Sequence, residues 1–579
     1  MKTARLKYLF LHDFLEEGPL VFENPLNELV AHSVEEVPTV LEEAERQAQQ
    51  GFYVAGYVTY EAAQAFYPDV PFHRLKELPY VWFGVFEGPS QTEKEVSRSD
   101  IGEIPRWKAD ISENEYKRRI ADIHSEIKKG RTYQVNFTFR LKTILDELDR
   151  RSWFNQLVEN QQANFAAHLE LDEHEILSVS PELFFAWDGS NLETKPMKGT
   201  IKRGWTSEED IELKEKLIDS EKDRAENVMI VDLLRNDMSR VAEAGTVNVS
   251  SLFNIETYPT VHQMTSTIHA LTRKGTKLVD VFRALFPCGS ITGAPKKSTM
   301  SIINNLETSP REVYCGAIGL LTPDGKAVFN VPIRTILFHK EKKEATYGVG
   351  GGITWDSSPG GEFEEAASKA EVLRRKAPTF ELLETMLVEE GTIKCREEHL
   401  SRVLKSADYF QFDLSRNYLE DLFDQLEQDG ETFKVRLLVS KKGHFTIEKH
   451  PYEVTEGKLE VSLANEPVSS EHLFLYHKTT NRLHYEERKL ACVFDTILWN
   501  EEGKITEFTN GNLAYLLEGE WFTPPVTDGL LPGTYRESLI REGKISERSL
   551  TKDELEKVEQ LVFINSVRGW MEVEMKPKG

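Results

Sequence analysis

Residues 344–375, EATYGVGGGITWDSSPGGEFEEAASKAEVLRR, place a glycine-dense apolar run directly before a charged run. The first part predicts a strand, and its glycines would let a ligand approach the backbone closely. The second part, from Glu362, predicts a helix. The glycine spacing is not the GxGxxG fingerprint of dinucleotide-binding proteins. We therefore expect a strand and a helix here, with a ligand site of another kind beside the glycines.

The rest of the front part also mixes strands and helices. Alternating or continuous apolar runs predict strands, and amphipathic runs closed by glycine predict helices. Strands and helices interspersed in this way favour an α+β fold. The predicted strands are FYVAGYVTYEAA (52–63), YVWFGVFEG (80–88) and ELFFAWDG (182–189), and the predicted helices are residues 113–130, ending at Gly130, and 225–245, ending at Gly245.

A domain boundary is predicted at Lys376-Ala377-Pro378. A charged helical run ends there, proline stops a helix, and the apolar run FELLETMLVE follows. We therefore expect a front domain of residues 1–376 and a back domain of residues 377–579. In the back domain the predicted strands are TFKVRLLVS (432–440), HFTIEKHPY (444–452), CVFDTILWN (492–500) and LVFINSVRGWMEVEM (561–575), and the predicted helix is REEHLSRVLKSADYFQF (396–412).

The composition is that of an acidic protein with ordinary hydrophobicity. The 579 residues carry a formal net charge of −25, and 40% of them are hydrophobic. Nucleic-acid binding needs a basic surface, so we expect no nucleic-acid partner. No apolar run approaches the ~20 residues of a membrane span, and the first residues do not resemble a signal peptide. The four cysteines form no CxxC pair, which indicates neither disulfides nor a cysteine zinc site. We expect a reduced, cytoplasmic protein.

Two acidic pairs are candidates for a metal site. Asp223 and Glu226 are three residues apart in one predicted helix, and Glu362 and Glu365 are three apart in another. Each pair therefore points to one helix face. Carboxylates brought together suit Mg2+, which takes carboxylate, water and substrate oxygens. Spacing alone, however, favours an ordinary solvated helix face in a chain this acidic.

Three other stretches are candidates for contact with an anionic substrate. Lys198 in KPMKGTIKRG would become a nucleophile if burial lowered its pKa. Backbone amides in FPCGSITGAPK (286–296) are suited to hold an anion. Arg334 lies in the strand-like run NVPIRTI, where a guanidinium usually has a carboxylate partner. The ordinary structural alternatives are a surface lysine, a connecting loop and a paired arginine.

The front part contains, in this order, GRTYQVNFTFRL, SPELFFAW, KPMKGTIKRG, DRAENVMIVDLLRNDMSRV, FPCGSITGAPK, REVYCGAIGLL, NVPIRTI and GGGITWDSSPGGEFEEAASKA. In this order the stretches resemble the chorismate-utilising family, which contains the anthranilate, aminodeoxychorismate, isochorismate and salicylate synthases. The resemblance covers about residues 110–375. It implies the two-sheet α/β sandwich of that family and chorismate as the substrate.

The resemblance also implies a role for each candidate residue. Mg2+ would be bound by Glu226 and Glu365, with Asp223 and Glu362 in support, and would neutralise the ring carboxylate of chorismate. Mg2+ and the basic side chains of the site would supply the positive charge that an anionic substrate needs in a chain with a net charge of −25. The implied substrate-binding residues are Tyr314 and Arg334 at the enolpyruvyl carboxylate, with Gly199, Thr200, Gly350, Gly351, Gly352 and Lys369 around the pocket.

Lys198 separates the branches of this family. Anthranilate synthases are similar but carry alanine at this position, and ammonia attacks their substrate directly. A lysine here implies that its amine attacks ring carbon C2 and expels the 4-hydroxyl, and that ammonia then adds at C4. An anthranilate- or isochorismate-forming front domain is the alternative. The chain has no Gly-x-Cys-x-Gly elbow of a glutaminase, so ammonia would come from a separate glutaminase subunit or from solution.

One position departs from the family pattern. Relatives place a histidine, the acid for the departing hydroxyl, where this chain has Gln263, and His262 stands one residue earlier. In a strand these two side chains would point to opposite faces. Either His262 shifts in register and acts as the catalytic acid, or another group or water does so.

The back domain carries its own candidates. They are Arg402 in HLSR, Lys478 in HKTTNR, Glu507 at a strand end, Gly533 opening a helix in LLPGTYRESLI, and Ser566 in the turn of INSVRG. A helix that opens on a glycine is suited to bind an anion. Each of these features, taken alone, is ordinary structure.

Together these residues resemble the fold-type IV pyridoxal-phosphate enzymes over about residues 380–575. The resemblance implies an aminotransferase-like α+β domain with pyridoxal 5'-phosphate as cofactor. Lys478 would form the Schiff base, and Glu507 would keep the pyridine nitrogen protonated. Arg402, Ser566 and the backbone amides of Thr534 and Tyr535 would hold the phosphate. Sites of this class are usually built between two subunits, which points to a homodimer through this domain.

HKTTNR, in which Asn481 and Arg482 follow the lysine, is most similar to the 4-amino-4-deoxychorismate lyases. That reaction needs only the lysine as base and the cofactor. The product of the front reaction would then be the substrate of the back domain. The two resemblances together imply a bifunctional transferase and lyase that converts chorismate to 4-aminobenzoate, a folate precursor. The alternatives are a transaminating back domain, or one that is a catalytically inactive module.

Overall fold

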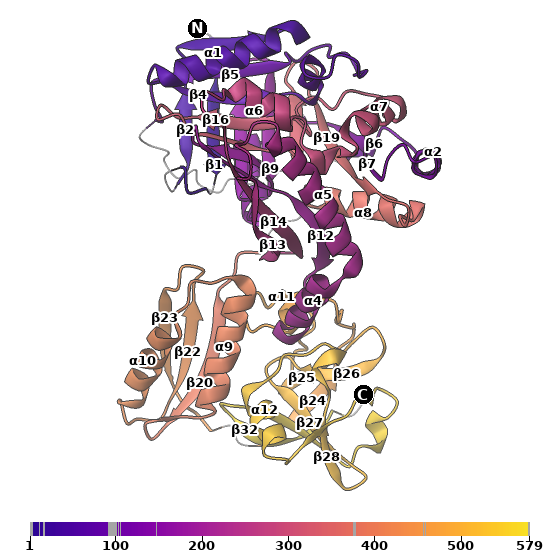
Figure 1. The fold of residues 1–579 in the computed structure, drawn as a ribbon. Helices are drawn as coiled ribbons and strands as arrows, with labels where there is room; N and C mark the ends of the chain where they lie inside the picture. Colours follow the sequence, from indigo (N-terminus) through magenta and orange to yellow (C-terminus); the bar gives the residue numbers. More distant parts are fainter. Residues whose placement is uncertain are drawn as a thin grey trace. The chain divides into compact units, whose positions relative to one another are not determined.

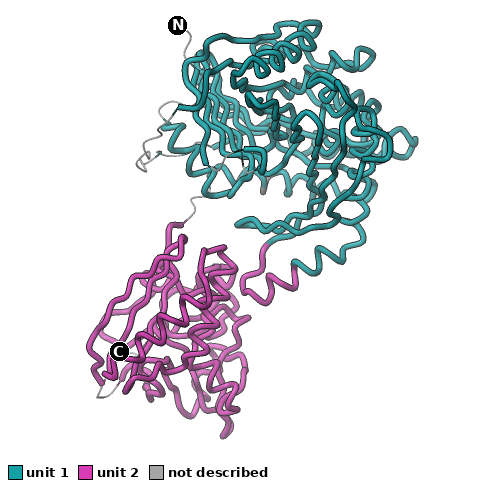
Figure 2. The backbone as a smooth tube through the Cα atoms, turned by 60° about the vertical axis from the view of Figure 1, so that its left-hand side comes forward, with its two compact units in different colours: residues 1–202, 214–377 teal, residues 203–213, 378–579 magenta. Residues whose placement is uncertain are grey.

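The computed structural model describes residues 4–10, 12–15, 18–90, 101, 104, 106–145, 148–374, 378–454, 457 and 459–576 (Figure 1). The chain forms two compact units (Figure 2). Unit 1 comprises Met1–Lys202 and Lys214–Ala377, and unit 2 comprises Arg203–Leu213 and Pro378–Gly579. Lys376 and Ala377 of the predicted boundary lie outside the described residues.

The segment Arg203–Leu213 precedes much of unit 1 in sequence but packs within unit 2. Arg203 pairs through Nε with Asp210 at 2.6 Å and donates to the carbonyl of Tyr409 at 3.0 Å. The Tyr409 hydroxyl donates in return to the carbonyl of Gly204 at 2.7 Å. The two contacts with Tyr409 join residues 205 and 206 positions apart, so no local sequence pattern could reveal them.

Unit 1 is built on two antiparallel sheets whose inner faces pack against each other. The inner core contains Tyr8 and Phe22 of the first sheet and Tyr57 and Trp82 of the second. The first sheet has the order β15 (Gly293–Ala294), β7 (Gln134–Ile144), β19 (Glu344–Ile353), β18 (Thr335–His339), β9 (His174–Ser180), β8 (Phe165–Glu170), β1 (Arg5–Phe10) and β2 (Leu20–Glu23), with β6 (Lys108–Ala109) on β7. The second has the order β12 (Met197–Lys202), β14 (Val261–Leu271), β11 (Asn191–Lys195), β10 (Leu183–Trp187), β17 (Ala327–Asn330), β16 (Ala317–Leu321), β4 (Tyr53–Val58), β5 (Val81–Phe86) and β3 (Asn27–Ala31), with β13 (Asn248–Thr257) on β14.

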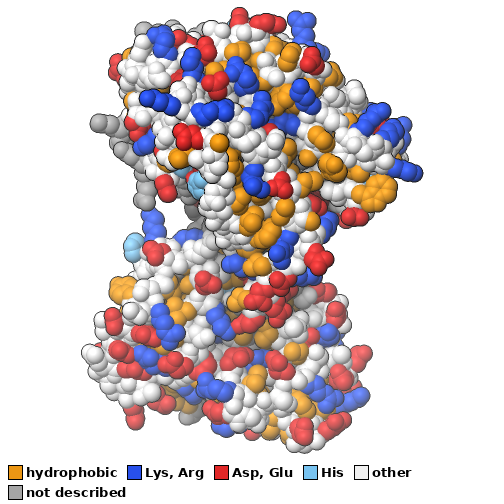
Figure 3. Space-filling view, in the orientation of Figure 1, with side chains coloured by type: hydrophobic (Ala, Val, Ile, Leu, Met, Phe, Trp, Pro, Cys, Tyr) orange, Lys and Arg blue, Asp and Glu red, His pale blue; other side chains and the backbone are white. Residues whose placement is uncertain are grey.

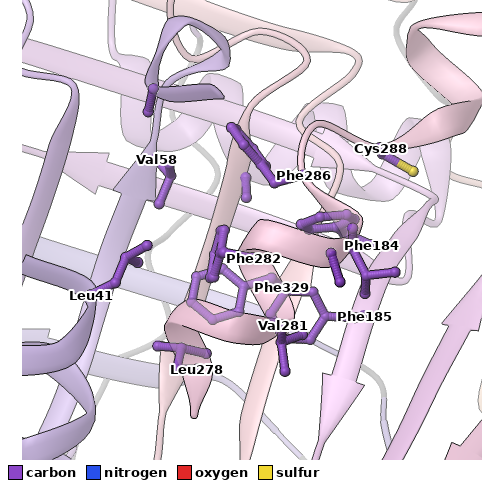
Figure 4. Close-up of a cluster of buried hydrophobic side chains, with 14 of the residues drawn as sticks. Leu41, Val58, Phe184, Phe185, Leu278, Val281, Phe282, Phe286, Cys288 and Phe329 are labelled. Carbon is purple, nitrogen blue, oxygen red and sulfur yellow. The ribbon is translucent and has the colours of Figure 1, made fainter. Parts of the chain in front are cut away.

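Helices cover the outer face of each sheet, because each sheet is apolar on both faces and must bury both. On the second sheet, Leu41, Phe282 and Phe329 belong to one apolar cluster (Figure 4). Its helices are α1 (Val37–Gln49), α5 (Glu221–Ser239) and α6 (Leu278–Leu285), and the first sheet is covered by α2 (Glu113–Lys128), α3 (Arg150–Gln161), α7 (Lys296–Leu306) and α8 (Pro359–Glu371). The remaining elements are α4 (Ser207–Asp219), η1 (Val34–Glu36), η2 (Tyr60–Ala65) and η3 (Gly289–Ile291). The predicted two-sheet α+β sandwich is confirmed.

Three local predictions for unit 1 are wrong. The strand expected over 52–63 ends at Val58, and a 3-10 helix follows. The helix expected to end at Gly245 ends at Ser239, because the chain then turns and Ala242 bridges to Thr272. Arg334, expected within a strand, precedes β18 and adopts a left-handed φ of 51°. Tertiary pairing overrides local preference at these places.

Unit 2 combines a small sheet with a closed barrel. The small sheet has the order β21 (Thr392–Ile393), β20 (Leu382–Glu389), β22 (Phe433–Val439) and β23 (Phe445–Pro451), and α9 (Arg396–Phe410) and α10 (Arg416–Glu427) pack on it. The second sheet has the order β29 (Ser546–Glu547), β28 (Glu520–Thr523), β27 (Asn512–Leu517), β31 (Gln560–Asn565), β32 (Gly569–Met575), β24 (Glu460–Leu463), β25 (Asp495–Trp499), β26 (Lys504–Phe508) and β30 (Leu550–Thr551). An additional pairing of β26 with β27 closes this sheet, and Phe508, Leu513 and Phe563 pack together in its core. The other elements are α11 (Leu483–Glu486), α12 (Thr534–Arg541), η4 (Leu473–Leu475), η5 (Val526–Asp528) and η6 (Leu555–Lys557).

The surface carries both signs of charge. On the face drawn in Figure 3, acidic and basic side chains are interspersed over both units. Among the helices of the described residues, none is long and apolar enough to cross a lipid bilayer.

Candidate functional site

Lys198 lies in β12, and its amine approaches the glycines of β19 in the other sheet. A Cβ atom added to Gly352 would lie only 2.6 Å from Lys198 Nζ and would overlap Gln134 Nε2. Only glycine leaves room here for both side chains. Burial lowers the pKa of Lys198, which enlarges the fraction of neutral amine able to act as a nucleophile.

Glu182 is the buried acid beside this lysine. It precedes β10, is 3% exposed, and accepts a hydrogen bond from the Ser290 hydroxyl at 2.5 Å. Burial raises the pKa of Glu182 to about 7, although Ser290 and the charge of Lys198 oppose the rise. Glu182 is therefore able to hold a proton near neutral pH. The sequence-based analysis missed it; the available signal was a glutamate directly before the wholly apolar run LFFAW.

Gln134, at the start of β7, also lies beside Gly352 and Lys198. The sequence-based analysis missed this residue too. Its side chain is 1% exposed, and neither amide atom has a hydrogen-bond partner among the described residues. Buried polar groups are almost always satisfied in native proteins. The amide beside Gly352 and Lys198 is thus suited to bind a substrate group or an ordered water.

The four predicted metal-binding carboxylates come from α5 and α8. Burial raises the pKa of Glu226, and the carboxylates of Asp223 and Glu362 add to the rise, so acids from both helices act on one another. No three of the four bring ligand atoms within 4.8 Å of one another in the described chain. The arrangement fits Mg2+, which usually keeps several waters and binds through one or two carboxylates plus substrate oxygens.

Each of the other three carboxylates has a local partner. The Ser220 hydroxyl caps α5 and contacts Asp223 Oδ2 at 2.5 Å. The Ser357 hydroxyl donates to Glu362 Oε1 at 2.6 Å. Glu365 Oε1 pairs with Lys369 at 2.7 Å, so metal binding by Glu365 would compete with this pair.

The predicted pocket glycines touch this acidic cluster. Gly199 has a φ of 94°, and a Cβ there would lie 3.0 Å from Asp223 Cβ. A Cβ on Gly351 would lie 3.2 Å from Glu362 Oε2. The carbonyl of Gly350 accepts a hydrogen bond from Lys369 Nζ at 2.9 Å. The structure thus brings the glycines, Lys369 and the carboxylates of the prediction to one place.

His262 and Gln263 occupy opposite faces of β14, as strand alternation requires. Gln263 donates to the carbonyl of Gly199 at 2.8 Å and accepts from the Thr200 hydroxyl at 2.9 Å. His262 lies 1% exposed with Nδ1 at 3.1 Å from the Thr257 hydroxyl. Gln263 therefore contacts two residues of the predicted pocket, whereas His262 points to the other face of the strand, and its role as the acid stays a prediction.

Arg334 lies directly before β18, and Tyr314 lies against β19. Arg334 donates to the side-chain carbonyl of Gln161, and burial lowers the pKa of Arg334. Tyr314 packs on the face of Gly348, where a Cβ would lie 2.5 Å from its ring. The Arg140 guanidinium lies 5.4 Å from the same ring. Both predicted residues are thus held by protein contacts close to the glycines of β19.

Lys478 is the central residue of the second candidate site. Burial lowers the pKa of Lys478 to about 7, and the charges of Arg402 and Arg482 act in the same direction. Its backbone carbonyl accepts from the amide of Leu383 at 3.0 Å. A lysine with this pKa is partly neutral at pH 7 and is suited to form a bond with an aldehyde.

Glu507, near the end of β26, faces the same interior. It is 3% exposed and accepts hydrogen bonds from the Tyr485 hydroxyl at 2.7 Å and the Leu531 amide at 3.1 Å. Burial raises the pKa of Glu507 to about 8. Such a group is able to share a proton with a ring nitrogen, as the prediction requires.

A cluster of polar groups surrounds the first turn of α12. Arg402 forms a fork with Glu384 at 2.8 and 2.6 Å and donates to the carbonyl of Pro532 at 3.3 Å. His399 Nε2 lies 3.1 Å from the Ser566 hydroxyl and 3.3 Å from the Thr534 hydroxyl. Arginine, hydroxyls and helix amides together are the donor set for a phosphate.

Two further features show that this cluster is built for close approach. A Cβ on Gly533 would overlap the side chain of Asn512, so glycine is required where α12 begins. Burial alone would raise the pKa of Glu384, but Arg402 and His399 hold it at about 2.

His399 and Glu384 were not among the residues predicted from the sequence. The signal was HLSR, in which a histidine three residues before the arginine shares its helix face.

The donor set fits pyridoxal 5'-phosphate. A lysine, a protonated acid and a phosphate cradle lie in one unit, and each was predicted. Tyr535, whose backbone amide was predicted to hold the phosphate, lies in the first turn of α12. The centroid of its ring is 5.2 Å from Lys394 Nζ.

With this geometry described, comparison with known proteins decides the family. The family model for chorismate binding enzymes matches residues 9–375. The chain belongs to the chorismate-binding enzymes. A second family model, for class IV amino-transferases, matches residues 381–575. The chain thus matches one family model in its front part and another in its back part, and its fold is that of a chorismate-binding enzyme followed by an aminotransferase-like domain.

Individual relatives match slightly less than half of this chain. Aminodeoxychorismate synthase component 1 of Klebsiella aerogenes is 41% identical over 45% of this chain and 58% of its own length. The aminodeoxychorismate synthase of Streptomyces griseus is 43% identical over 47% of this chain and 36% of its own length. The chain therefore spans less than two thirds of these relatives. The crystal structure of anthranilate synthase component I from Streptococcus pneumoniae TIGR4 is 22% identical, covers 64% of this chain and 92% of its own, and has a TM-score of 0.53, which supports the fold.

Proposed function

We propose that unit 1 converts chorismate and ammonia to 4-amino-4-deoxychorismate, and that unit 2 releases pyruvate from this product to give 4-aminobenzoate. The observation that carries the proposal is the amine of Lys198, with lowered pKa, beside Glu182, Gln134 and Gly352. The matched relatives named aminodeoxychorismate synthase support it further. The ammonia would come from a separate glutaminase subunit or from solution.

In the front reaction, Lys198 acts as the nucleophile and Glu182 as the acid. The neutral amine of Lys198 bonds to ring carbon C2 while both ring double bonds shift and the 4-hydroxyl leaves. Glu182 donates its proton to that hydroxyl, so water departs rather than hydroxide. Ammonia then adds at C4, both double bonds shift back, and the bond to Lys198 breaks. This acid role replaces the one expected of His262.

The other residues of unit 1 position the substrate. Mg2+ held by Glu226 and Glu365, with Asp223 and Glu362 in support, would neutralise the ring carboxylate. Gln134 offers an unused amide to a substrate oxygen. Arg334 offers its guanidinium to the second carboxylate, in the bidentate manner that arginine favours.

In unit 2, the residues are suited to hold a cofactor and move one proton. Pyridoxal 5'-phosphate bound at Lys478 supplies an electron sink. Arg402, Ser566 and the first amides of α12 would hold its phosphate, and Glu507 would keep a proton on its ring nitrogen. Lys478 would take the proton from substrate C4, after which pyruvate leaves and the ring becomes aromatic.

Products identified by mass test both halves in one experiment. The purified chain is incubated with chorismate, Mg2+, an ammonium salt and pyridoxal 5'-phosphate. We expect 4-aminobenzoate and pyruvate from the native chain, no amination from Lys198→Ala, and accumulation of 4-amino-4-deoxychorismate from Lys478→Ala. Formation of anthranilate or isochorismate would contradict the front assignment. Exchange of an amino group with an added α-keto acid would contradict the back one.

A further inference from the structure

Two buried histidines face each other across neighbouring strands of the first sheet of unit 1. His174 begins β9 and His339 ends β18, and the two are direct partners in the antiparallel register. Their ring centroids are 4.9 Å apart, and each residue is 7% exposed. Direct cross-strand partners keep their side chains within reach of a common ligand.

A carboxylate from a distant segment completes the group. Glu77 lies in the connection between η2 and β5, and its Oε2 is 3.2 Å from His339 Nδ1. One ligand atom from each of Glu77, His174 and His339 lies within 4.8 Å of the others, the only such group among the described residues. His339 Nδ1 is buried and makes no hydrogen bond. Its approach to Glu77 is thus an ion-pair contact without hydrogen-bond geometry, which leaves the hydrogen-bonding capacity of this buried nitrogen unused.

We propose that Glu77, His174 and His339 bind a zinc ion, separate from the carboxylate site. Two imidazoles and one carboxylate are a common zinc ligand set, which leaves a fourth position for water. Ligand atoms about 2.0–2.2 Å from one tetrahedral ion lie about 3.4 Å apart, so the separations within the group, all within 4.8 Å, must shorten by up to about 1.4 Å. Glu77 is exposed and on a connecting segment, so it is free to make that movement.

The protonation states suit a cation. Burial lowers the pKa of His174 to about 4 and also lowers the pKa of His339, so both rings are neutral, as ligands must be, at pH 7. Lys342 pairs with Glu77 Oε1, and the charges of Lys340 and Lys342 disfavour a nearby cation. The Lys342 side chain is 54% exposed and can turn to solvent, which leaves both carboxylate oxygens to the ion.

Ligand type and position distinguish this site from the carboxylates of α5 and α8. Imidazole nitrogen favours zinc over magnesium, whereas carboxylate and water favour magnesium. His339 pairs with Glu344 at the first residue of β19, while the glycines of the candidate active site lie near the opposite end of that strand. Zinc here would tie the Glu77 segment to two strands of the sheet and act as a structural clamp.

Metal content of the full chain tests the proposal. The protein is stripped with a chelator and then dialysed against Zn2+ with Mg2+ in large excess, which occupies the carboxylate site. We expect one zinc per chain in the native protein, and at least about tenfold weaker binding in His174→Gln and in His339→Gln. The control is His269→Gln, because His269 also lies beside a glutamate, with Nδ1 3.8 Å from Glu193 Oε2, but is half exposed.

Cobalt substitution provides a second measurement that does not depend on zinc content. Co2+ in the native chain should give the visible absorption of a four-coordinate site with nitrogen ligands, and each of the two substitutions should remove it while circular dichroism stays unchanged. Equal zinc binding by native and His174→Gln protein would overturn the proposal, as would the absence of zinc from the native chain. Neither result bears on the chorismate reaction, which is assayed separately.

Discussion

Replacement of Gly352 by alanine should disable the front reaction while leaving the chain folded. The added Cβ would lie 2.6 Å from Lys198 Nζ, whereas such atoms need about 3.5 Å, so the amine must move by about 1 Å. A misplacement of this size costs on the order of 100-fold in rate, or about 2.7 kcal/mol of transition-state stabilisation. The atoms that must move are chiefly the ends of the Lys198 and Gln134 side chains, so stability should fall by about 1–3 kcal/mol, which leaves the chain folded.

The assay compares kcat/KM for chorismate amination with conversion of added 4-amino-4-deoxychorismate by the same preparation. We expect the first to fall about 100-fold and the second to stay unchanged. Gly360→Ala is the matched control, because a Cβ there meets no atom within 4 Å. Native kcat/KM for Gly352→Ala would refute the placement of Lys198 beside this glycine. A loss of both activities with a lowered melting temperature would instead indicate misfolding.

Glu182→Gln should reduce chorismate amination by about 100-fold or more and remove the decline of rate as pH rises through about 7, because the carboxyl acts only while it holds its proton. Ser290→Ala should move that decline to higher pH, since the lost hydrogen bond favours the carboxylate; a pH profile of kcat/KM that stays unchanged in both variants would show that another group is the acid. Lys478→Ala should abolish release of pyruvate and also lose the cofactor absorbance of the native chain, whereas retained absorbance would contradict its bond to the cofactor. Glu384→Gln should destabilise unit 2 by about 3–5 kcal/mol at pH 7 in urea unfolding, because Arg402 loses its buried partner. The Glu384 pKa of about 2 lies below its ordinary value, so the native contribution is present above about pH 4.5 and vanishes as pH falls to about 2; an equal loss at pH 2 and pH 7 would contradict this origin.

Local sequence was sufficient to predict a helix or strand where the pattern of apolar residues repeats over a short span. The apolar period and the flanking glycine predict a helix over 113–130, and α2 spans Glu113–Lys128. The strand predicted over 561–575 is instead a hairpin of two strands, β31 (Gln560–Asn565) and β32 (Gly569–Met575). The pairs Asp223 with Glu226 and Glu362 with Glu365 lie on helices as expected, because i and i+3 positions always share a helix face. Resemblance to known families added the roles of residues that no spacing could assign.

Only the tertiary structure shows what lies across from a residue. Gln134 and Gly352 approach Lys198 from separate strands, Glu182 acts on it electrostatically from the residue before β10, and the pKa shifts arise from burial that a linear chain does not reveal. The segment Arg203–Leu213 joins unit 2 for the same reason. Sequence therefore indicated candidate site residues through the order of the motifs, and it indicated many of the elements that hold them through local periodicity. The structure shows that Glu182 is a buried acid with a raised pKa and where Glu77 meets two histidines, because desolvation and distance depend on contacts between residues far apart in the chain.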